Sequence, residues 1–418
     1  MGKKILFITS TSPAVNPRLS KEVQTALQEG YSPTVVYFKL GIWADAQSRT
    51  WLQDLQIPSY ELDATRSAPY PWLFATIAAR VLAALGKWWR LSLFAQSVIV
   101  DKRTWVLQRF LKRHKGQYQL LIAHNMGALY PAYAWARRHQ IPFAFDVEDY
   151  HPGEKGIADQ PLQRRYNETL LQQLLPPAAY VSYASPLIRD RVLSLFQQKL
   201  DWNRHIVIVN SFQQVEFLPP KAGVGKVKFV WFSQNIAEGR GLELFVPELY
   251  RFKDQVEVHL IGNLYSSFYD GFLHRYASIL TFYPPCSQLE LNRKLTEFDI
   301  GLAIESSSTD ENRDICWTNK ILAYAQAGLY ILATDTRGQR LFMKAHPSHG
   351  IICEQNAASV YQRIDYILHE IASIRQTSAT RYQTAQVLAW EKEGARLTAV
   401  WRGIIEKQTT TEPVWGSF

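Results

Sequence analysis

The sequence predicts an α/β protein made of two parallel α/β domains. The start of the chain places a strand, a helix and a second strand in the order that gives a parallel βαβ unit. The same alternation restarts after residue 226, and 418 residues are enough for two domains of ordinary size. We therefore expect a first domain over residues 1–210 and a second over residues 211–390.

The first domain begins with a short β-rich run, KKILFITS, which we predict to be a strand and not a signal peptide. The next segment, RLSKEVQTALQEG, repeats its apolar residues with a helical period and ends at Gly30. Asn16 is a candidate N-cap of this helix, and Pro17 suits its first turn. The later strands expected in this domain are TVVYF (34–38), LLIA (120–123), FAFDV (143–147), AYVSYA (179–184) and IVIVN (206–210).

The middle of this domain, residues 71–115, has a different composition. Its first part, PWLFATIAARVLAALGKWWRLSLF, is apolar and aromatic and carries charge only at Arg80, Lys87 and Arg90. One interpretation is two or three helices packed on a sheet. The other is an interfacial surface whose aromatic anchors and basic residues meet an anionic membrane.

Basic residues concentrate in the same region. Lys87–Lys115 holds eight of them and one acid, Asp101, which gives 8 − 1 = +7 within a chain of net charge +9. Such a patch favours an anionic partner. We expect an anionic membrane surface and not a nucleic acid, since nucleic-acid binding would leave the two-domain architecture unexplained.

Cysteine content and hydropathy indicate the compartment. The three cysteines are far apart and in no metal-ligand spacing, which is typical of a reducing cytoplasm. No run of 18 or more uncharged apolar residues occurs, so we expect no membrane-spanning helix. The expected location is the cytoplasm, with a peripheral position on the membrane.

The second domain follows SFQQVEFLPPKAGVGKVK (211–228), a segment rich in Pro, Gly and Lys that we predict to be an interdomain linker. The tail WEKEGARLTAVWRGIIEK is an amphipathic helix. Six strand-like runs lie between them, with helical stretches between most: VKFVWFSQ (227–234), VEVHLIG (256–262), SILTFYPP (278–285), IGLAIE (300–305), YILATD (330–335) and GIICE (350–354).

In parallel sheets, ligands bind beyond the carboxyl ends of the strands, so the loops that follow strands contain the candidate residues. The first loop, TSTSPAVNPR, lacks a GxGxxG motif. Arg18 and Asn16 could hold an anion or a sugar near the start of the next helix. The alternative is a capped helix start with no ligand.

Two further strand exits in the first domain carry titratable residues. His124 ends one strand, and FDVEDYHPGE places Asp146, Glu148, Asp149 and His151 at the exit of the next. So dense a cluster suits sugar hydroxyls or proton transfer. Its spacing is not that of a metal site, and we expect none. The alternatives are a packing histidine and a solvated loop.

Two loops of the second domain offer phosphate ligands. In WFSQNIAEGRGLE, glycines on either side of Arg240, one of them Gly241, allow close backbone approach to a ligand, and the guanidinium can grip phosphate with two hydrogen bonds. In TNKILAYAQAG, Asn319 and Lys320 start a helix. Arg240 and Lys320 together could hold one diphosphate.

These motifs resemble those of retaining glycosyltransferases of the GT-B fold, of the family 4 type, over nearly the whole chain. The resemblance rests on SQNIAEGRGLE, on NRDICWTNKILAYAQAG with the following LYILATDTRGQ, on HNMGALYPAYAWARR, on FDVEDYHPGE and on WEKEGARLTAVW. It implies two Rossmann-like domains facing across a cleft. It also implies that the C-terminal helix, within 391–418, packs back on the first domain.

The resemblance implies a function for each domain. The second domain would bind a nucleotide sugar, with its diphosphate on Arg240, Gly241, Lys320 and Asn319. Asn235 stands where the family often has a second basic residue, so that contact would be weaker. The first domain would bind a glycan or a lipid-linked acceptor through Arg18, Asn16, Glu148, Asp149 and His151. The implied transfer needs no metal and no cofactor besides the nucleotide sugar.

The chain departs from the family at two acids. Many members carry two Glu seven residues apart, one near the donor sugar and one on the ribose, and Ile315 and Ala323 stand there instead. A lost ribose hydrogen bond costs roughly 1–3 kcal/mol, so a glutamate restored at 323 is expected to tighten donor binding if the site is a working, modified one. If the site is a relic, the change is expected to do nothing. The nearby acids that could replace the first Glu are Glu305, Asp310, Glu311 and Asp314, and nothing obvious replaces the second. We expect Glu311 to be catalytic with His124 and Asp146.

The sequence leaves three functions open. The first is an active retaining glycosyltransferase. The second is a catalytically degenerate GT-B-like protein that binds ligand or serves as a scaffold, which the two missing acids favour. The third is another enzyme of the same fold, such as a sugar epimerase or a phosphorylase.

Overall fold

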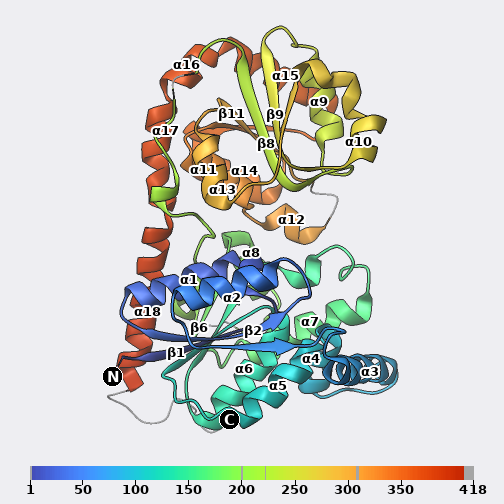
Figure 1. Ribbon diagram of the computed structural model, residues 1–418, viewed down its shortest axis with the longest axis vertical. Coiled ribbons are helices and arrows are strands. Elements are labelled where there is room, and N and C mark those ends of the chain that lie inside the picture. Colours follow the sequence, from blue (N-terminus) through green and yellow to red (C-terminus); the bar gives the residue numbers. More distant parts are fainter. Residues whose placement is uncertain (1, 199–200, 222, 307–309, 409–418) are drawn as a thin grey trace. The chain divides into compact units, whose positions relative to one another are not determined.

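The computed structural model describes residues 2–198, 201–221, 223–306 and 310–408, and the chain forms two compact units (Figure 1). Unit 1 comprises Met1–Ile208 and Gly394–Phe418, and unit 2 comprises Val209–Glu393. The first observed boundary follows residue 208, where the sequence placed it after 210, and the chain rejoins unit 1 at 394, where the sequence placed the return at 391. The last part of that C-terminal segment, 409–418, lies outside the described residues.

Unit 1 contains a seven-stranded parallel sheet with the order β3-β2-β1-β4-β5-β6-β7. The order reverses between β1 and β4, the position where ligands bind in such sheets. The strands are β1 (Lys4–Thr9), β2 (Ser32–Lys39), β3 (Ser59–Asp63), β4 (Leu120–His124), β5 (Phe143–Val147), β6 (Tyr180–Tyr183) and β7 (His205–Val207).

Helices cover this sheet. α6 contacts β1, β4 and β5, while α4, α5 and α7 pack against α6. The helices are α1 (Pro17–Gln28), α2 (Ala44–Asp54), α3 (Pro69–Leu85), α4 (Leu93–Val100), α5 (Arg103–Arg113), α6 (Met126–His139), α7 (Pro161–Leu174) and α8 (Pro186–Leu193), with 3₁₀ helices η1 (Pro13–Val15), η2 (His151–Gly153) and η3 (Trp202–Arg204). β4 and β5 are buried along their whole length, as expected for parallel strands covered on both faces.

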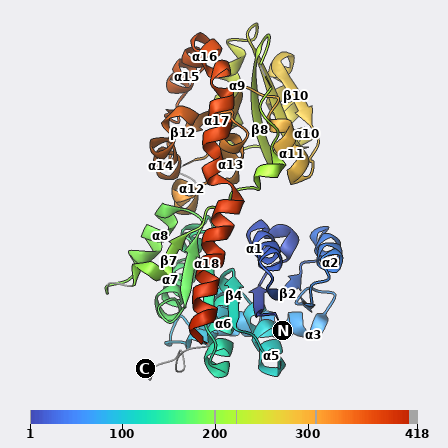
Figure 2. The same cartoon turned by 90° about the vertical axis from the view of Figure 1, so that its left-hand side faces the viewer.

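The C-terminal helix α18 (Trp390–Gln408) contributes to the core of unit 1 from Gly394 onward. Trp401 is fully buried, lies edge-on to Phe7 and Tyr31, and its indole N–H donates to Tyr180 Oη at 2.8 Å. Figure 2 shows α18 as one continuous helix. The predicted amphipathic tail helix is confirmed.

Unit 2 contains a six-stranded parallel sheet with the order β10-β9-β8-β11-β12-β13. The strands are β8 (Val227–Ile236), β9 (Val256–Leu264), β10 (Leu280–Tyr283), β11 (Ile300–Ala303), β12 (Tyr330–Thr334) and β13 (Gly350–Cys353). The helices are α9 (Leu242–Tyr250), α10 (Ser266–Gly271), α11 (Gln288–Leu295), α12 (Glu311–Ile315), α13 (Asn319–Gln326), α14 (Arg337–Ala345), α15 (Ala357–His369), α16 (Ile371–Gln376) and α17 (Ser378–Thr384), with 3₁₀ helices η4 (Gln214–Glu216), η5 (Leu273–Ile279), η6 (Pro347–His349) and η7 (Ala385–Leu388).

The segment predicted to be a linker is instead part of unit 2. Phe212 and Phe217 are buried, and the Phe212 backbone exchanges two 2.9 Å hydrogen bonds with the Gln326 side chain. The Pro and Gly content of 211–228 is typical of irregular structure, but its two buried phenylalanines hold the segment against the unit. Composition alone does not show this anchoring.

The sequence prediction differs from the structure in two places within unit 1. It missed β3, an edge strand whose residues are exposed or half-buried and which has no apolar run to mark it. The segment 71–115 does form three helices, but α3 packs against α4 and α5, with Ala75 as its single buried residue. Within the described part of the chain, no helix combines the length and the apolar character needed to cross a bilayer.

Candidate functional site

The glycine loop of unit 2 joins β8 to α9. Gly241 has φ +83°, and a Cβ at this position would collide with Ile304 Cγ2, so the loop requires glycine. The Gly239 N–H donates to Glu243 Oε1 at 2.6 Å, which ties the loop to the first turn of α9. Arg240 is half-exposed and forms no ion pair with the residues that the structure describes.

Lys320 lies in the first turn of α13 and is engaged by an acid. Its Nζ is 2.6 Å from Glu305 Oε1, and the two side chains are 17% and 9% exposed. Glu305 directly follows the end of β11, and Thr334 at the end of β12 accepts from its backbone N–H at 2.8 Å. The backbone of Glu305 is therefore held at the strand ends, and its carboxylate pairs with Lys320.

Arg240 and Lys320 line one cavity of about 390 Å³. β8 and β11, neighbours at the point where the strand order of unit 2 reverses, supply its walls through Trp231, Ser233 and Ile304. Thr334 and Gln355 add polar groups. The cavity thus has the size and position of a ligand site in a doubly wound sheet.

A third cation in the cavity was missed by the sequence analysis. Arg313, on the short helix α12, lines the same cavity, and its Nε lies 3.5 Å from Asp310 Oδ2. Its side chain is 37% exposed. Arg313 stands among three acids, Asp310, Glu311 and Asp314, and no glycine motif marks it. Its relation to the cavity depends on how α12 lies.

The other residues expected around the donor lie outside this lining. Among the described residues that line the cavity, Asn235, Asn319 and Glu311 do not occur. Asn235 pairs with Asn263 where β8 and β9 continue past a register shift. The Asn319 side chain accepts from Asn210 Nδ2 at 3.4 Å. The roles assigned to these three residues stay predictions.

The positions that lack the family acids are buried. Ile315 is 1% exposed and Ala323 is fully buried, and neither lines the cavity among the residues described. α13 is buried over Ile321–Gln326, so it packs as a core helix. A glutamate at 323 would place a carboxylate in this core, which argues against a contact between that side chain and the donor.

Unit 1 brings together polar residues from four strands and one helix. Thr9, His124, Asp146 and Ser182 occupy one register row across β1, β4, β5 and β6. Residues paired in this way point to the same face of a sheet. Sequence analysis named His124 and Asp146 but not Ser182, whose hydroxyl donates to Asp146 Oδ1.

Arg18 is buried against this row. Its Nε is 2.8 Å from Glu22 Oε1, one turn along α1, its Nη2 is 3.2 Å from Asp146 Oδ1, and its Nη1 donates to the Ile208 carbonyl at 2.7 Å. The side chain is fully buried. In this structure Arg18 acts as an internal counter-ion. Its side chain exposes no group that could make the predicted contact with an acceptor.

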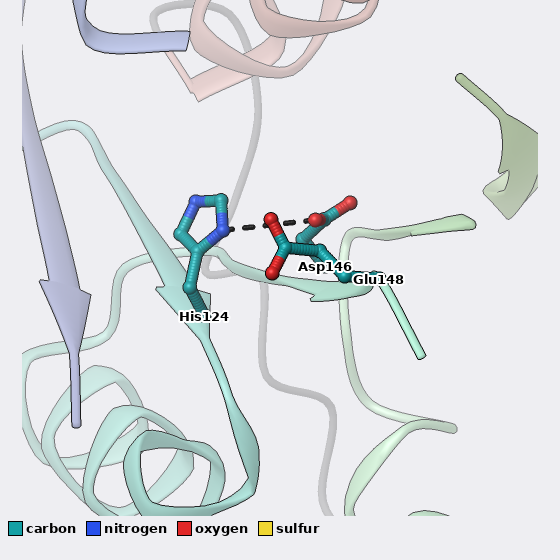
Figure 3. A group of neighbouring side chains, drawn as sticks. All are labelled: His124, Asp146 and Glu148. Atoms are coloured by element: carbon teal, nitrogen blue, oxygen red, sulfur yellow. Dashed lines mark ion pairs between the residues drawn. The ribbon is translucent and has the colours of Figure 1, made fainter. Parts of the chain in front are cut away.

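His124 completes the cluster. Its Nε2 lies 3.4 Å from Glu22 Oε2 and its Nδ1 lies 3.6 Å from Asp146 Oδ2, and all three side chains are buried. Burial alone would lower the pKa of His124, but the Glu22 and Asp146 carboxylates outweigh it and raise that pKa. Figure 3 shows the imidazole turned toward the Asp146 carboxylate, with Glu148 beside it.

Glu148 is the surplus carboxyl of the cluster. Burial and the neighbouring Asp146 charge raise its pKa to about 8, so it is protonated at neutral pH. Single ligand atoms of His124, Asp146 and Glu148 lie within 4.8 Å of one another, a spacing that a metal ion could use. Arg18 already places a positive charge beside Asp146, so this carboxylate does not require a metal ion as its counter-ion.

The remaining residues expected in unit 1 lie around this cluster. Asn16 caps α1 by accepting from the Leu19 N–H at 2.9 Å, with Pro17 in the first turn, so the predicted helix start is confirmed. His151 Nδ1 is 2.8 Å from Glu154 Oε1. Asp149 is half-buried in the same loop. The ligand roles of these residues stay predictions.

No family model matches the chain, and no curated protein matches it in sequence. Solved structures do. Anabaena HepE in complex with UDP has a TM-score of 0.66 at 13% identity and covers 96% of this chain and 100% of its own. Sucrose-phosphate synthase from Thermosynechococcus elongatus has a TM-score of 0.64 at 12% identity, covering 97% and 100%. UDP-GlcNAc 2-epimerase from Neisseria meningitidis, bound to UDP-GlcNAc, has 0.59 at 10% identity, covering 96% and 100%.

At these identities the likeness concerns the fold. Sucrose-phosphate synthase and UDP-GlcNAc 2-epimerase, two different kinds of enzyme, share it. The matches span nearly the whole chain and include both parallel sheets. The strand orders of the two sheets are those of doubly wound α/β domains. The chain therefore has the GT-B fold, with two Rossmann-like parallel α/β domains, as its sequence predicted.

Proposed function

We propose that this protein is a retaining glycosyltransferase that moves a sugar from a nucleotide-sugar donor to a glycan or a lipid-linked acceptor, without a metal. The observation that carries the proposal is the cavity of unit 2, where Arg240, Arg313 and Lys320 converge at the ends of β8 and β11. Three cations in a partly buried site suit a diphosphate. The complexes of HepE with UDP and with UDP-glucose make uridine donors the first to test.

The cations would act on the leaving group. When the glycosidic bond to the donor breaks, negative charge builds on the β-phosphate. Arg240 and Lys320 are placed to stabilise that charge, and Lys320 would have to leave Glu305 to do so. Arg313 would supply the basic contact that Asn235 does not.

We propose a less direct role for the cluster of unit 1. His124 and Asp146 are fully or almost fully buried, so we assign them the positioning of the acceptor loop after β5. Glu148, Asp149 and His151 are the partly exposed members and remain the candidates for acceptor contact. Glu311 remains a candidate near the donor sugar.

The proposal is tested with a panel of uridine, guanosine and adenosine diphosphate sugars. We expect one donor to release its nucleoside diphosphate when a glycan or lipid extract is added, with no loss of rate in a chelator. The anomeric configuration of the product should match that of the donor. If no donor turns over and no nucleotide shifts the melting temperature, the enzyme proposal fails.

Variants locate the donor site. Arg240→Ala and Lys320→Ala should each lower kcat/KM by about a hundredfold, the effect of roughly 3 kcal/mol of lost charge stabilisation. His151→Ala should lower it less. Lys221→Ala, an exposed lysine of the same unit paired with Glu297, is the matched control and should leave it unchanged.

A second candidate is a binding protein without turnover. Buried Ile315 and Ala323 leave no carboxylate at the two family positions. This candidate predicts tight nucleotide binding that Lys320→Ala weakens, with no product from any donor. A sugar epimerase, which the likeness to UDP-GlcNAc 2-epimerase keeps open, would instead change the donor sugar in the absence of an acceptor.

We also propose that the protein is cytoplasmic and peripheral on an anionic membrane.

A further inference from the structure

Helix α3 presents its large apolar side chains to solvent. Six of them are between 37% and 75% exposed: Tyr70, Leu73, Phe74, Ile77, Val81 and Leu85. At about 100° per residue these positions fall within an arc of about 120° on one side of the helix. We call them the α3 stripe. Scattered apolar residues are normal on surfaces, but a continuous stripe marks a contact surface.

Two tryptophans follow the α3 stripe along the chain. Trp88 and Trp89 are 84% and 69% exposed. Tryptophan side chains with this exposure are typical of membrane interfaces, where the ring is apolar and the indole N–H stays hydrated. Figure 1 shows α3 at the periphery of unit 1, beyond α4.

Cations crowd beside the stripe. Arg66 Cζ and Lys102 Nζ lie 5.6 and 5.4 Å from the centre of the Trp72 ring on α3. Partial burial and then the charges of Arg103, Arg80 and Arg66 lower the pKa of Lys102. These like charges are therefore close enough to oppose one another. Asp101 offsets part of this repulsion, and an anionic partner would relieve it further.

A cavity of about 600 Å³ is lined by the segment 86–93, which includes Trp88 and Trp89, and by residues of α7. Lys87, Arg90 and Arg165 line it, and no acidic side chain does so among the described residues. None of these three cations forms an ion pair with a residue that the structure describes. The cavity thus offers unneutralised charge next to exposed aromatic rings.

We propose that α3, Trp88, Trp89 and this cavity dock on an anionic lipid bilayer. The α3 stripe lies at the boundary of headgroups and acyl chains, and Lys87, Arg90 and Arg165 hold the phosphate of a lipid headgroup. This inference rests on the proposed function. It adds which surface of the protein meets the lipid and which residues hold the headgroup. Its test uses no sugar donor, so either can fail alone.

Charge argues against a second copy of the chain as the occupant. In a two-fold symmetric contact the same patch faces itself, so the cations around Trp72 would meet their own copies. Anionic headgroups complement both the cations and the stripe. Each basic residue near such a surface strengthens binding by about fivefold, and salt weakens it.

The test is co-sedimentation of the full chain with vesicles of phosphatidylcholine alone and of phosphatidylcholine with phosphatidylglycerol in equal parts. We expect binding to the mixed vesicles, weakened by salt, and little binding to the neutral ones. Phe74→Asp should reduce binding by about tenfold or more, and Arg90→Gln with Arg165→Gln by about twentyfold. Free inorganic phosphate should shift the melting temperature of the protein less than the mixed vesicles do.

Matched controls come from unit 1. Trp43 is 66% exposed, so Trp43→Asp controls for Phe74→Asp. Arg137→Gln with Arg138→Gln, two exposed arginines at the end of α6 and outside the basic segment 87–115, controls for the cavity pair. The controls should bind as the wild type does. Equal sedimentation with neutral and mixed vesicles, or equal loss in test and control variants, would overturn the proposal. So would a dimer in light scattering that Phe74→Asp dissociates while vesicle binding is unchanged.

Discussion

Lys320 Nζ and Glu305 Oε1 lie 2.6 Å apart in the cavity of unit 2, so a cation proposed to hold the donor is paired with a carboxylate of its own unit. Both side chains are largely buried, and the backbone of Glu305 is held at the ends of two strands. If the cavity binds a donor as proposed, the diphosphate would compete with Glu305 for Lys320. The acid would then weaken binding of the ground state.

Glu305→Gln tests this competition. Removing the carboxylate charge should tighten the binding of a nucleoside diphosphate by about fivefold, the effect of roughly 1 kcal/mol between charges at this range. Titration calorimetry with the nucleotide found in the donor panel measures it. Glu297→Gln, an exposed acid paired with Lys221, is the control and should not change the affinity. Weaker binding in Glu305→Gln would show that the acid positions Lys320 and does not compete with the ligand.

Ala323→Glu distinguishes a missing ligand contact from a core position. The residue is fully buried in α13, so the introduced carboxylate should destabilise unit 2 by about 3 kcal/mol or more. Urea unfolding measures the loss, and Ala323→Ser, a small polar change at the same place, should cost less. A stable Ala323→Glu protein that binds nucleotide more tightly would restore the role expected from the sequence.

The sequence indicates features that depend on local chemistry. Strand exits, glycine spacing and the start of α13 located Arg240 and Lys320, because parallel strands bring successive loops to one edge. Asn16 was identified as a cap from its place before Pro17. Features that depend on packing were not readable from the sequence. Arg313 enters the cavity only through the orientation of α12, and the buried state of Ala323 comes from the tertiary packing of α13.

The cluster of unit 1 shows the same division. Arg18 and Glu22 lie four residues apart, a helical spacing that brings charges together and could have signalled an ion pair. Their burial against Asp146 depends on how α1 lies on the sheet. Period and spacing do not give that placement, so Arg18 was expected to contact a ligand.

Arg18→Ala should destabilise unit 1 by about 3–5 kcal/mol, because it leaves two carboxylates without their buried counter-ion. Thermal or urea unfolding measures this loss. The double variant Arg18→Ala with Asp146→Asn should recover part of it, since one of the uncompensated charges is removed. If Arg18→Ala instead unfolds like the wild type and only raises the KM for an acceptor, Arg18 is a ligand contact after all.

Glu148→Gln should flatten the pH dependence of stability. The pKa of Glu148 is raised from 4.5 to about 8 by burial and by Asp146, so between these values the folded protein holds a proton that the unfolded chain releases. Stability from this group is therefore present below about 4.5 and is lost as pH rises through about 8. Because the Glu148 side chain is partly exposed, we expect the free energy of unfolding to fall by about 2 kcal/mol over this range. Glutamine is always neutral, so Glu148→Gln should not show this fall.

His124 also makes the protein less stable as pH rises, but over a higher pH range than Glu148. Its pKa is raised above 6.5 by Glu22 and Asp146 against the effect of burial, so its contribution is lost as pH rises through that raised value. Glu148→Gln should therefore make the unfolding free energy fall less with rising pH between about pH 4.5 and 6.5, and should keep the part of the slope above pH 6.5 that His124 contributes. Urea unfolding across this range measures both, with exposed Glu29→Gln as the matched variant that keeps the wild-type profile. An unchanged slope below pH 6.5 in Glu148→Gln would mean that Glu148 is ionised in the folded protein.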